Sequence, residues 1–433
     1  MTTNTMRLDI LPNDVLLMIF DHCDEHDLLR LSEVCSRFYD LVRRSDMTWI
    51  KKRKQFLVTN QMSERFRERC NTILPPRSTC FVSQKWQYGI YRKEMVFTQK
   101  TKLMPWLRLT NDILWWCGGN ELLGFGRKRT MIDSTYGNNH YTGEIYTGGD
   151  ICKFVPWKDF VICGYTNGAI SYFLKRYGKN KCCIVKLLLN NDSSVNAIDA
   201  TSENVIAGLE SGTIKIQRHP DMDTSERNVY NVSETCVNLR DKVRSLSVDP
   251  TGVKFAVGSA GTTQDIPPLH VIDIESHTEI DTMRHKWRHG AGILDMVWDD
   301  PNTLLTCGYD TYIRKWDLRT ERCVSKWVDP TDASLYCISS DHRYTMVTGT
   351  QYNCLAVLWD QRKTDFVQLY YVNMRESSRR SPIYSIQFDN THLYCATDKH
   401  VIELNFSGRL HQKFDYKAMY IPLDKHHRMR INY

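Results

Sequence analysis

Residue types that can carry out chemistry stand close together at one place in the sequence. His289, Thr306 and Asp310 follow one another there, and Trp316 comes soon after them. A carboxylate that orients an imidazole, which in turn accepts a hydroxyl proton, forms the core of a catalytic relay. The same residue types can also build a structural network that satisfies buried polar groups between strands. The elements around these residues must decide between the two interpretations.

Other residues with chemical potential lack the partners that a site requires. His22 and His26 could hold a metal from one helix face, but no third ligand is near them in the sequence. We interpret them as part of a solvated helix face. The sequence contains no GxxxxGK[ST] or GxGxxG loop for phosphate, and neither HExxH nor GxSxG occurs. We therefore expect no catalytic residue, no metal and no cofactor.

The composition is that of an ordinary globular chain. Of its 433 residues, 42% are hydrophobic and 25% are charged, which excludes disordered and fibrous proteins. The formal net charge of +7 permits an acidic partner but does not require nucleic acid. No apolar run is long enough to cross a membrane, and the 15 cysteines are scattered without a CxxC pair. We expect free thiols, a cytoplasmic or nuclear location and no membrane partner. The 11 tryptophans and 22 tyrosines indicate a large β domain.

Residues 1–48 have the pattern of two or three short amphipathic helices. Apolar side chains recur at helical spacing from Val15 to Phe20, after a helix start at Pro12 or Asn13. A second set follows Asp27, which we expect to be the N-cap of the next helix. So short a segment can hardly bury its own apolar residues. It is therefore either a cap on the following domain or a docking module whose apolar face a partner covers.

A basic stretch follows these helices over residues 49–70. Besides the run at 51–54, it contains Arg65, Arg67 and Arg69. We interpret it as the solvated face of linker helices, and binding of nucleic acid or acidic lipid is the alternative. Pro75 and Pro76 then interrupt the helical pattern.

From about residue 104, the sequence repeats a unit of alternating strands separated by Gly, Asp or Asn turns. Two units end on Trp316-Asp317 and Trp359-Asp360. The apolar anchors of the expected third strands are 43 to 55 residues apart, and the longest interval contains an insertion at Ser259–Pro268. These anchors are Leu123, Ile170, Ile214, Leu269, Ile313, Ala356 and Val401. A period near 40–45 residues with a final Trp-Asp is typical of four-stranded WD blades, and seven blades close a ring.

The two halves of the chain together resemble the F-box/WD-repeat family. The N-terminal positions that match an F-box in order are Leu11-Pro12, Val15-Leu16, Ile19-Phe20, Asp27-Leu28, Leu31, Val34-Cys35, Phe38 and Trp49. Phe38 stands where many members have Trp. The resemblance implies an all-α F-box at residues 5–52 and a basic helical linker at 53–103. It further implies an all-β WD-repeat propeller of seven blades at 104–415 and a C-terminal tail at 416–433.

This resemblance implies a function as the substrate-recognition subunit of an SCF-type E3 ubiquitin ligase, which itself catalyses nothing. The F-box would dock on a Skp-type adaptor, and the adaptor would bridge to a cullin–RING core. The implied adaptor-facing residues are Leu11, Pro12, Leu16, Ile19, Phe20, Leu28, Leu31, Val34, Cys35 and Phe38. The alternative is that part of this set, above all Leu31 and Val34, holds the helices together.

The resemblance also assigns roles within the propeller. His289, Thr306, Asp310 and Trp316 would form the hydrogen-bonded structural tetrad of one blade, which removes the need for a catalytic relay. Basic and aromatic residues of the loops on one face would bind an acidic or phosphorylated peptide of a protein substrate. They are Arg240, Arg244, Arg284, Arg288, Tyr309, Tyr352, Arg375, Arg379 and Arg380. Ordinary solvated loops, a scaffold outside ubiquitination and, with less support, a nucleic-acid-binding propeller are the alternatives.

Overall fold

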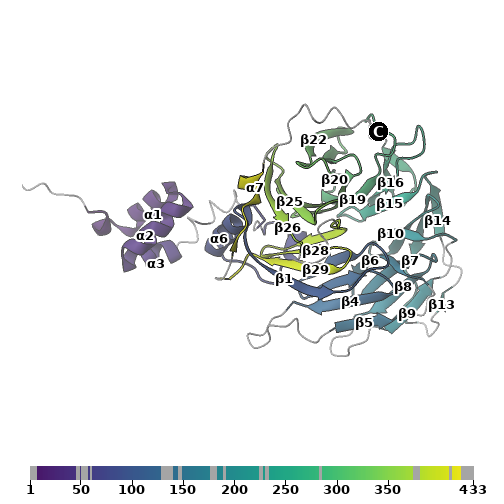
Figure 1. The fold of residues 1–433 in the computed structure, drawn as a ribbon, viewed down its shortest axis with the longest axis horizontal. Coiled ribbons are helices and arrows are strands. Elements are labelled where there is room, and N and C mark those ends of the chain that lie inside the picture. The colour runs from purple at the N-terminus through teal and green to yellow at the C-terminus, as the bar shows by residue number, and fades with distance from the viewer. Residues whose placement is uncertain are drawn as a thin grey trace, which may run out of the picture.

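The protein consists of a small helical domain and a large β domain (Figure 1). The computed structural model describes residues 7–44, 49, 57–58, 61–127, 140–144, 149–175, 183–188, 192–223, 228–229, 234–281, 285–373, 381–408 and 412–420. Within these ranges, no helix combines the length and the apolar character needed to cross a membrane.

Among its described residues, the helical domain contains a short 3-10 turn, η1 (Leu8–Ile10), and three helices whose bounds are described. They are α1 (Asn13–His22), α2 (Glu25–Val34) and α3 (Ser36–Arg44). The N-cap of α2 is Asp24, which accepts a hydrogen bond from the Asp27 amide at 2.8 Å, so the predicted cap at Asp27 is wrong. The domain does form a core, which contains Leu16, Phe20, Leu28, Phe38, Val42 and Trp49 together with Cys80 from further along the chain.

The described residues of the linker contain α5 (Glu64–Arg67) and α6 (Pro76–Gln87). Helix α6 begins directly after Pro75 and has Pro76 at its first position, where a missing amide hydrogen costs nothing. Its Cys80 packs into the core of the helical domain, whereas Val82 and Trp86 pack into the core of the β domain. The helix therefore belongs to both domains, and it lies between them in Figure 1.

The β domain contains seven antiparallel sheets. The first sheet contains β2 (Trp106–Leu109), β3 (Ile113–Cys117), β4 (Glu121–Gly126) and β5 (His140–Glu144). The second contains β6 (Ile151–Trp157), β7 (Phe160–Tyr165), β8 (Ile170–Leu174) and β9 (Cys183–Leu188). The third contains β10 (Val195–Ala200), β11 (Asn204–Leu209), β12 (Thr213–Arg218) and β14 (Glu234–Asn238). A short parallel strand, β13 (Asn228–Val229), extends the second sheet beside β9.

The fourth sheet contains β15 (Val243–Val248), β16 (Lys254–Ser259), β17 (Leu269–Asp273) and β18 (Glu279–Asp281). The fifth contains β19 (Ile293–Asp300), β20 (Thr303–Gly308), β21 (Tyr312–Asp317) and β22 (Arg322–Val328). The sixth contains β23 (Leu335–Ser340), β24 (Thr345–Thr350), β25 (Leu355–Asp360) and β26 (Phe366–Tyr371). The seventh contains β27 (Ser385–Phe388), β28 (His392–Ala396), β29 (His400–Asn405), β1 (Ile90–Thr98) and β30 (Gln412–Lys413).

The sheets form a closed ring. The first strand of each sheet contacts the first strand of the next, in the order β2, β6, β10, β15, β19, β23, β27 and back to β2. Hydrophobic clusters fill the spaces between neighbouring sheets. Glycine permits the close approach at several of these contacts: a side chain at Gly208 would overlap Val243 of the next sheet. The predicted seven-bladed propeller is confirmed.

The predicted third-strand anchors all lie on the third strands of their sheets, which are β4, β8, β12, β17, β21, β25 and β29, and all are buried. The long fourth repeat is explained by the loop between β16 and β17, which contains the predicted insertion.

The limits of the propeller differ from the expected ones. Strand β1 lies in the stretch assigned to the linker, yet it pairs with β29 along most of its length and closes the ring. The expected start at residue 104 is therefore too late. Helix α7 (Tyr416–Met419) lies in the expected tail but packs on β26, where the rings of Tyr416 and Tyr371 are 4.9 Å apart. Residues 421–433 lie outside the described part of the chain.

Only part of the predicted tetrad forms. The indole nitrogen of Trp316 donates to Thr306 Oγ1 at 2.9 Å, and Trp359 makes the same bond to Thr348 at 3.0 Å in the next blade. Asp310 instead forms an ion pair with Arg314. His289 is exposed, so its predicted place in the tetrad is wrong. Another histidine lies closer to the tryptophan: the rings of His285 and Trp316 have centroids 5.6 Å apart.

Candidate functional site

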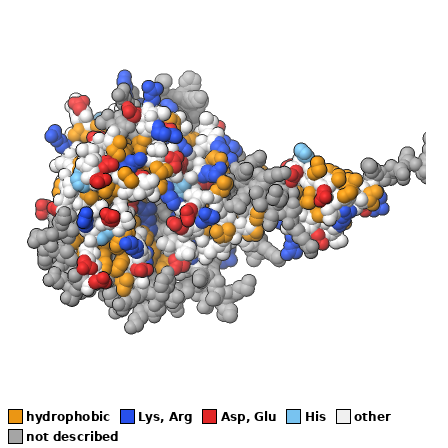
Figure 2. Space-filling view, turned by 180° about the vertical axis from the view of Figure 1, so that it is seen from behind, with side chains coloured by type: hydrophobic (Ala, Val, Ile, Leu, Met, Phe, Trp, Pro, Cys, Tyr) orange, Lys and Arg blue, Asp and Glu red, His pale blue; other side chains and the backbone are white. Residues whose placement is uncertain are grey.

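The helical domain exposes many large apolar side chains for its size. Figure 2 shows hydrophobic side chains gathered on its surface. The most exposed large ones are Leu8, Ile10, Val15, Met18, Ile19, Val34 and Tyr39, with Met18 at 69% and Val34 at 67%. Helix α1 is apolar on two faces, because Leu16 and Phe20 fill the core while Met18 points to solvent. Apolar surface of this kind marks a site of protein association.

Arg37 on α3 holds the beginning of this surface in place. Its Nη2 donates to the carbonyl oxygen of Leu11 and to Asn13 Oδ1, both at 2.6 Å, and its Nη1 donates to the carbonyl of Asp9. These bonds fasten η1 and the start of α1 against α3. The position of Leu8 and Ile10 is therefore fixed by a charged side chain rather than by burial.

The linker docks on one end of the propeller through two arginines. Arg65 Nη1 donates to the carbonyl of Trp298 at 3.1 Å, and Arg69 donates to Ser339 Oγ at 3.1 Å and to the carbonyl of Ser340. Burial lowers the pKa of Arg69 to about 10. These two residues therefore do not form the solvated face that the basic stretch predicted.

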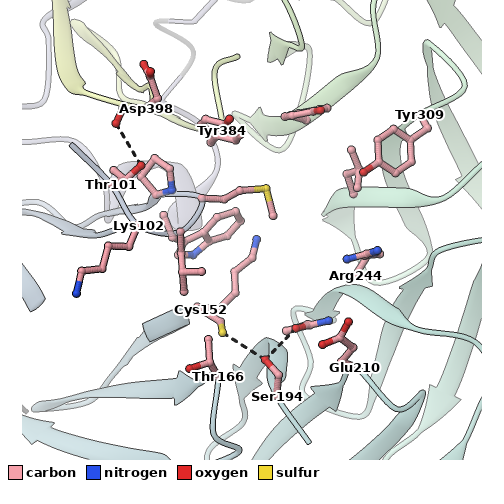
Figure 3. A pocket seen from close by; sticks show the side chains of 18 residues that line it. Thr101, Lys102, Cys152, Thr166, Ser194, Glu210, Arg244, Tyr309, Tyr384 and Asp398 are labelled. Carbon is pink, nitrogen blue, oxygen red and sulfur yellow. Dashed lines mark hydrogen bonds between the residues drawn. The ribbon is translucent and has the colours of Figure 1, made fainter. Parts of the chain in front are cut away.

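A cavity of about 740 Å³ lies at the other end of the central channel (Figure 3). Every sheet, or the loop next to it, contributes to its wall. Representative residues, in ring order, are Trp106, Cys152, Asn196, Arg244, Leu294, Tyr336 and Tyr384. Strand β19 shows the direction of the channel, since Leu294 near its start lines the cavity and Trp298 further along accepts the bond from Arg65.

Backbone bulges aim side chains into this cavity. In five blades, the register between the first two strands slips by one residue near the start of the first strand. The residue left over at each slip is Cys152, Asn196, Arg244, Leu294 or Tyr336, and all of them line the cavity. Bulges re-aim side chains in this way at the rims of sheets. The cavity is thus a repeated feature of the fold with a different residue in each blade.

The cavity wall combines opposite charges. The basic residues Lys102, Lys153 and Arg244 and the acidic residues Glu210 and Asp398 all line it. The Glu210 carboxylate is already engaged, because Lys242 lies 3.0 Å from it. Burial lowers the pKa of Lys153 to about 8, since a buried ammonium loses its hydration. This arrangement suits recognition of a polar ligand.

Comparison with known proteins agrees with both halves of the structure. Residues 8–54 match the F-box-like domain family. The chain is 27% identical to F-box/WD repeat-containing protein 4 of Homo sapiens over 408 residues, which covers 92% of each protein. The corresponding Mus musculus protein is also 27% identical over 408 residues and is covered to 93% of its length. The chain is therefore similar to F-box/WD-repeat proteins over nearly its whole length.

The finer resemblance from the sequence was to dactylin, which is another name for F-box/WD repeat-containing protein 4. It rested on the single F-box near the N-terminus, the Met104-Pro105-Trp106 segment and the degenerate blades, and the similarity to that protein confirms it. A chain of the "Crystal Structure of Mitotic Checkpoint Complex" aligns with a TM-score of 0.56 at 14% identity, covering 74% of this chain and 95% of that one. At this identity the likeness shows the fold alone.

The structure divides the predicted adaptor-facing set of the F-box. Leu16, Phe20, Leu28 and Phe38 are buried in the domain's own core, so a partner cannot reach them while the domain stays folded. These four positions fit the alternative in which part of the set holds the helices together. The half-buried members are Leu11, Leu31 and Cys35, and the exposed members are Pro12, Ile19 and Val34. Sequence reasoning missed Met18, although helical spacing places it on the face opposite Leu16 and Phe20.

The predicted substrate-binding residues of the propeller are divided in a similar way. Arg244 and Tyr309 line the cavity. Arg240, Arg288 and Tyr352 are exposed and do not line it. Arg284, Arg375, Arg379 and Arg380 lie outside the described residues. Sequence reasoning missed Lys153, Tyr336 and Tyr384, although each closely follows the first apolar residue of a repeat.

Proposed function

We propose that this chain is the substrate-recognition subunit of an SCF-type E3 ubiquitin ligase. The F-box binds a Skp-type adaptor, which connects it to a cullin–RING core, and the propeller binds a protein substrate for ubiquitination and proteasomal degradation. The chain acts by proximity and breaks no bond itself. The observation that carries the proposal is the exposed apolar face of the F-box, with Met18 and Val34 two-thirds exposed beside a filled core.

The connection between the domains supports a function by proximity. Helix α6 packs into both cores, and Arg65 and Arg69 fasten the linker to the propeller. A substrate on the propeller would therefore be held at a restricted distance from the adaptor, which raises its effective concentration near the ligase. Such a ligase would act in the cytoplasm or the nucleus, where reducing conditions preserve free thiols such as those of Cys23 and Cys236.

Recovery of partners from cells tests the proposal. The tagged wild-type chain should recover a Skp-type adaptor and a cullin. Val15→Glu with Met18→Glu should reduce adaptor recovery at least about tenfold, because charges would have to be buried in an apolar interface. Val253→Glu is the matched control, since Val253 is an equally exposed apolar residue on the propeller.

The outcomes separate the alternatives. Recovery of neither adaptor nor cullin by the wild type would refute the receptor function. Recovery of the adaptor without a cullin would favour a scaffold outside ubiquitination. A steep salt dependence of RNA or DNA affinity would favour the nucleic-acid alternative, which has less support because Arg65 and Arg69 are engaged by the propeller.

A further inference from the structure

Lys153 on β6 is a half-buried charge that lies against an aromatic ring. Its Nζ lies 3.0 Å from the centre of the Trp106 ring, so the ammonium rests on an aromatic face. Within the described part of the chain, it makes no hydrogen bond or ion pair. The carboxylate of Asp295 attracts the ammonium from nearby but forms no ion pair with it, and its two oxygens accept from the amides of Met296 and Ile338 at 3.0 Å each. A partly buried ammonium without a hydrogen bond gains from a ligand that supplies an anionic acceptor.

A second donor on the same cavity is also unsatisfied. Arg244 is the extra residue of the bulge in β15, and its buried Nε has no partner among the described residues. The indole nitrogen of Trp106 is likewise buried without an acceptor in the described structure. Figure 3 shows Arg244 on the side of the cavity below Tyr309 and across from Cys152. The cavity therefore offers several donors to one ligand.

Three tyrosines form another part of the wall. The rings of Tyr309 and Tyr336 are 6.3 Å apart, and those of Tyr336 and Tyr384 are 5.8 Å apart. They come from three successive blades, and Tyr309 is 42% exposed. A row of aromatic rings provides apolar contact area with few rotatable bonds. An apolar side chain next to the anion would pack against this row.

We propose that this cavity binds a peptide carboxylate through Lys153 and Arg244, while an aromatic or aliphatic neighbour of that carboxylate packs on Tyr309, Tyr336 and Tyr384. The inference rests on the proposed function and names the substrate class: an unphosphorylated acidic peptide with an apolar residue beside its carboxylate.

The charge of the wall favours a carboxylate over a phosphate. Lys102, Lys153 and Arg244 carry three positive charges and Glu210 and Asp398 carry two negative ones, while Lys242 beside Glu210 and Asp295 near Lys153 cancel one another. The single excess positive charge matches a monoanion. A phosphate group carries about two negative charges at neutral pH and would be repelled by the two carboxylates. The carboxylate can come from an Asp or Glu side chain or from the C-terminus of a substrate, and the two sources require separate tests.

Peptide selection on the full chain, purified with its adaptor, tests the inference. One random heptapeptide library presents free C-termini and a second presents internal peptides. Enrichment of Asp or Glu beside apolar residues in the internal library would identify a side-chain carboxylate. Enrichment only in the first library would identify a C-terminal one. Peptides without an acid, or no enriched peptide at all, would overturn the inference.

The best selected peptide then serves as a labelled probe for affinity. Replacing its carboxylate by an amide should weaken binding at least about tenfold, as should Lys153→Met or Arg244→Gln, because each removes a charge-assisted hydrogen bond. Arg288→Gln is the control, since Arg288 is an exposed arginine that does not line the cavity. Tighter binding of a peptide with phosphoserine in place of the acid would contradict the inference.

Stability separates a binding role of Lys153 from a structural one. Lys153→Met removes a charge that forms no direct ion pair but keeps the aliphatic stem, so the variant should melt close to the temperature of the wild type while it loses peptide affinity. A lower melting temperature with unchanged affinity would show that Lys153 is structural.

The results also separate this inference from the proposed function. If the wild type recovers no adaptor, the proposed function fails whatever the peptide result. If the wild type recovers adaptor and cullin but selects no acidic peptide, only this inference fails.

Discussion

The indole ring of Trp86 stacks on the ring of Phe406, with centroids 3.7 Å apart and planes inclined by 15°. Trp86 is on α6, and Phe406 directly follows β29 in the seventh blade. The indole nitrogen also donates to the carbonyl of Asn390 at 3.3 Å. Since Cys80 of the same helix lies in the F-box core, this stacking is one end of the contact that connects the two domains.

Trp86→Ala should destabilise the protein by about 3–5 kcal/mol, because it removes a fully buried aromatic side chain and leaves a cavity. Urea unfolding of the full chain measures the loss. Tyr88→Ala at the end of the same helix is the control, since Tyr88 is largely exposed and its removal should have little effect. Equal losses in both variants would show that the stacking does not contribute to the stability of the chain.

The ion pair of Arg127 and Asp389 is the most buried one described, with both side chains almost fully enclosed. Arg127→Met should cost about 3–5 kcal/mol, because Asp389 would remain buried without its counter-charge. The Arg127 guanidinium also donates to the carbonyls of Arg69 and Thr110, both at 2.7 Å, and these acceptors would lose a partner. Arg319→Met, which removes an exposed ion pair with Asp317, should leave the unfolding midpoint almost unchanged.

Asp389 should also make the fold sensitive to acid. Burial alone would raise the pKa of its carboxyl, but the charge of Arg127 and hydrogen bonds from the following turn outweigh burial and hold this pKa well below its usual range. An unfolded aspartate titrates near pH 4. The stabilising contribution is therefore present above about pH 4 and is lost as the pH falls further. The difference in unfolding free energy between the wild type and Arg127→Met should shrink in this acidic range; a constant difference would contradict the assignment.

Asp341 should have the opposite pH dependence. Burial raises the pKa of Asp341 to about 6, above the value near 4 in the unfolded chain. Its contribution is therefore greatest below about pH 4 and is lost as the pH rises through about 6. Asp341→Asn removes this titration and keeps the oxygen that accepts from the amides of Arg343, Tyr344 and Thr345 at 2.9 Å each. The unfolding free energy of the variant relative to the wild type should rise between pH 4 and pH 7, and parallel pH profiles would refute the prediction.

The sequence predicted the blades well because their signal is local. Each third strand carries an apolar anchor such as Ile313 at a fixed place in a repeated unit, and alternation with period two identifies a strand. The residues at the mouth of the channel were harder to predict. Tyr336 and Arg244 face the cavity because a bulge turns them there, and alternation along a strand does not reveal a bulge.

Long-range contacts explain the other differences. Strand β1 has an ordinary strand pattern, but nothing near it in the sequence shows that its partner is β29, at the other end of the chain. In the F-box, Leu16 and Met18 are both apolar residues of α1, and helical spacing shows only that they point in different directions. Packing on α2 and α3 decides which of them is internal. The sequence therefore predicts which residues are apolar but not which of them remain for a partner.

The incomplete tetrad can be tested through Thr306 and His289. Thr306→Val keeps the shape of the side chain but removes the acceptor of the Trp316 indole hydrogen, which is fully buried. An unsatisfied buried donor costs about 1–3 kcal/mol. His289→Ala should change stability by less than about 0.5 kcal/mol, because the imidazole is exposed and Asp310 pairs with Arg314. Urea unfolding of both variants measures the contrast, with the slope of the transition as a check that both unfold in the same way. If His289→Ala lowered the unfolding free energy as much as Thr306→Val, the imidazole would have to join the hydrogen-bonded network in solution. An exposed side chain without such a hydrogen bond does not stabilise the blade to that extent.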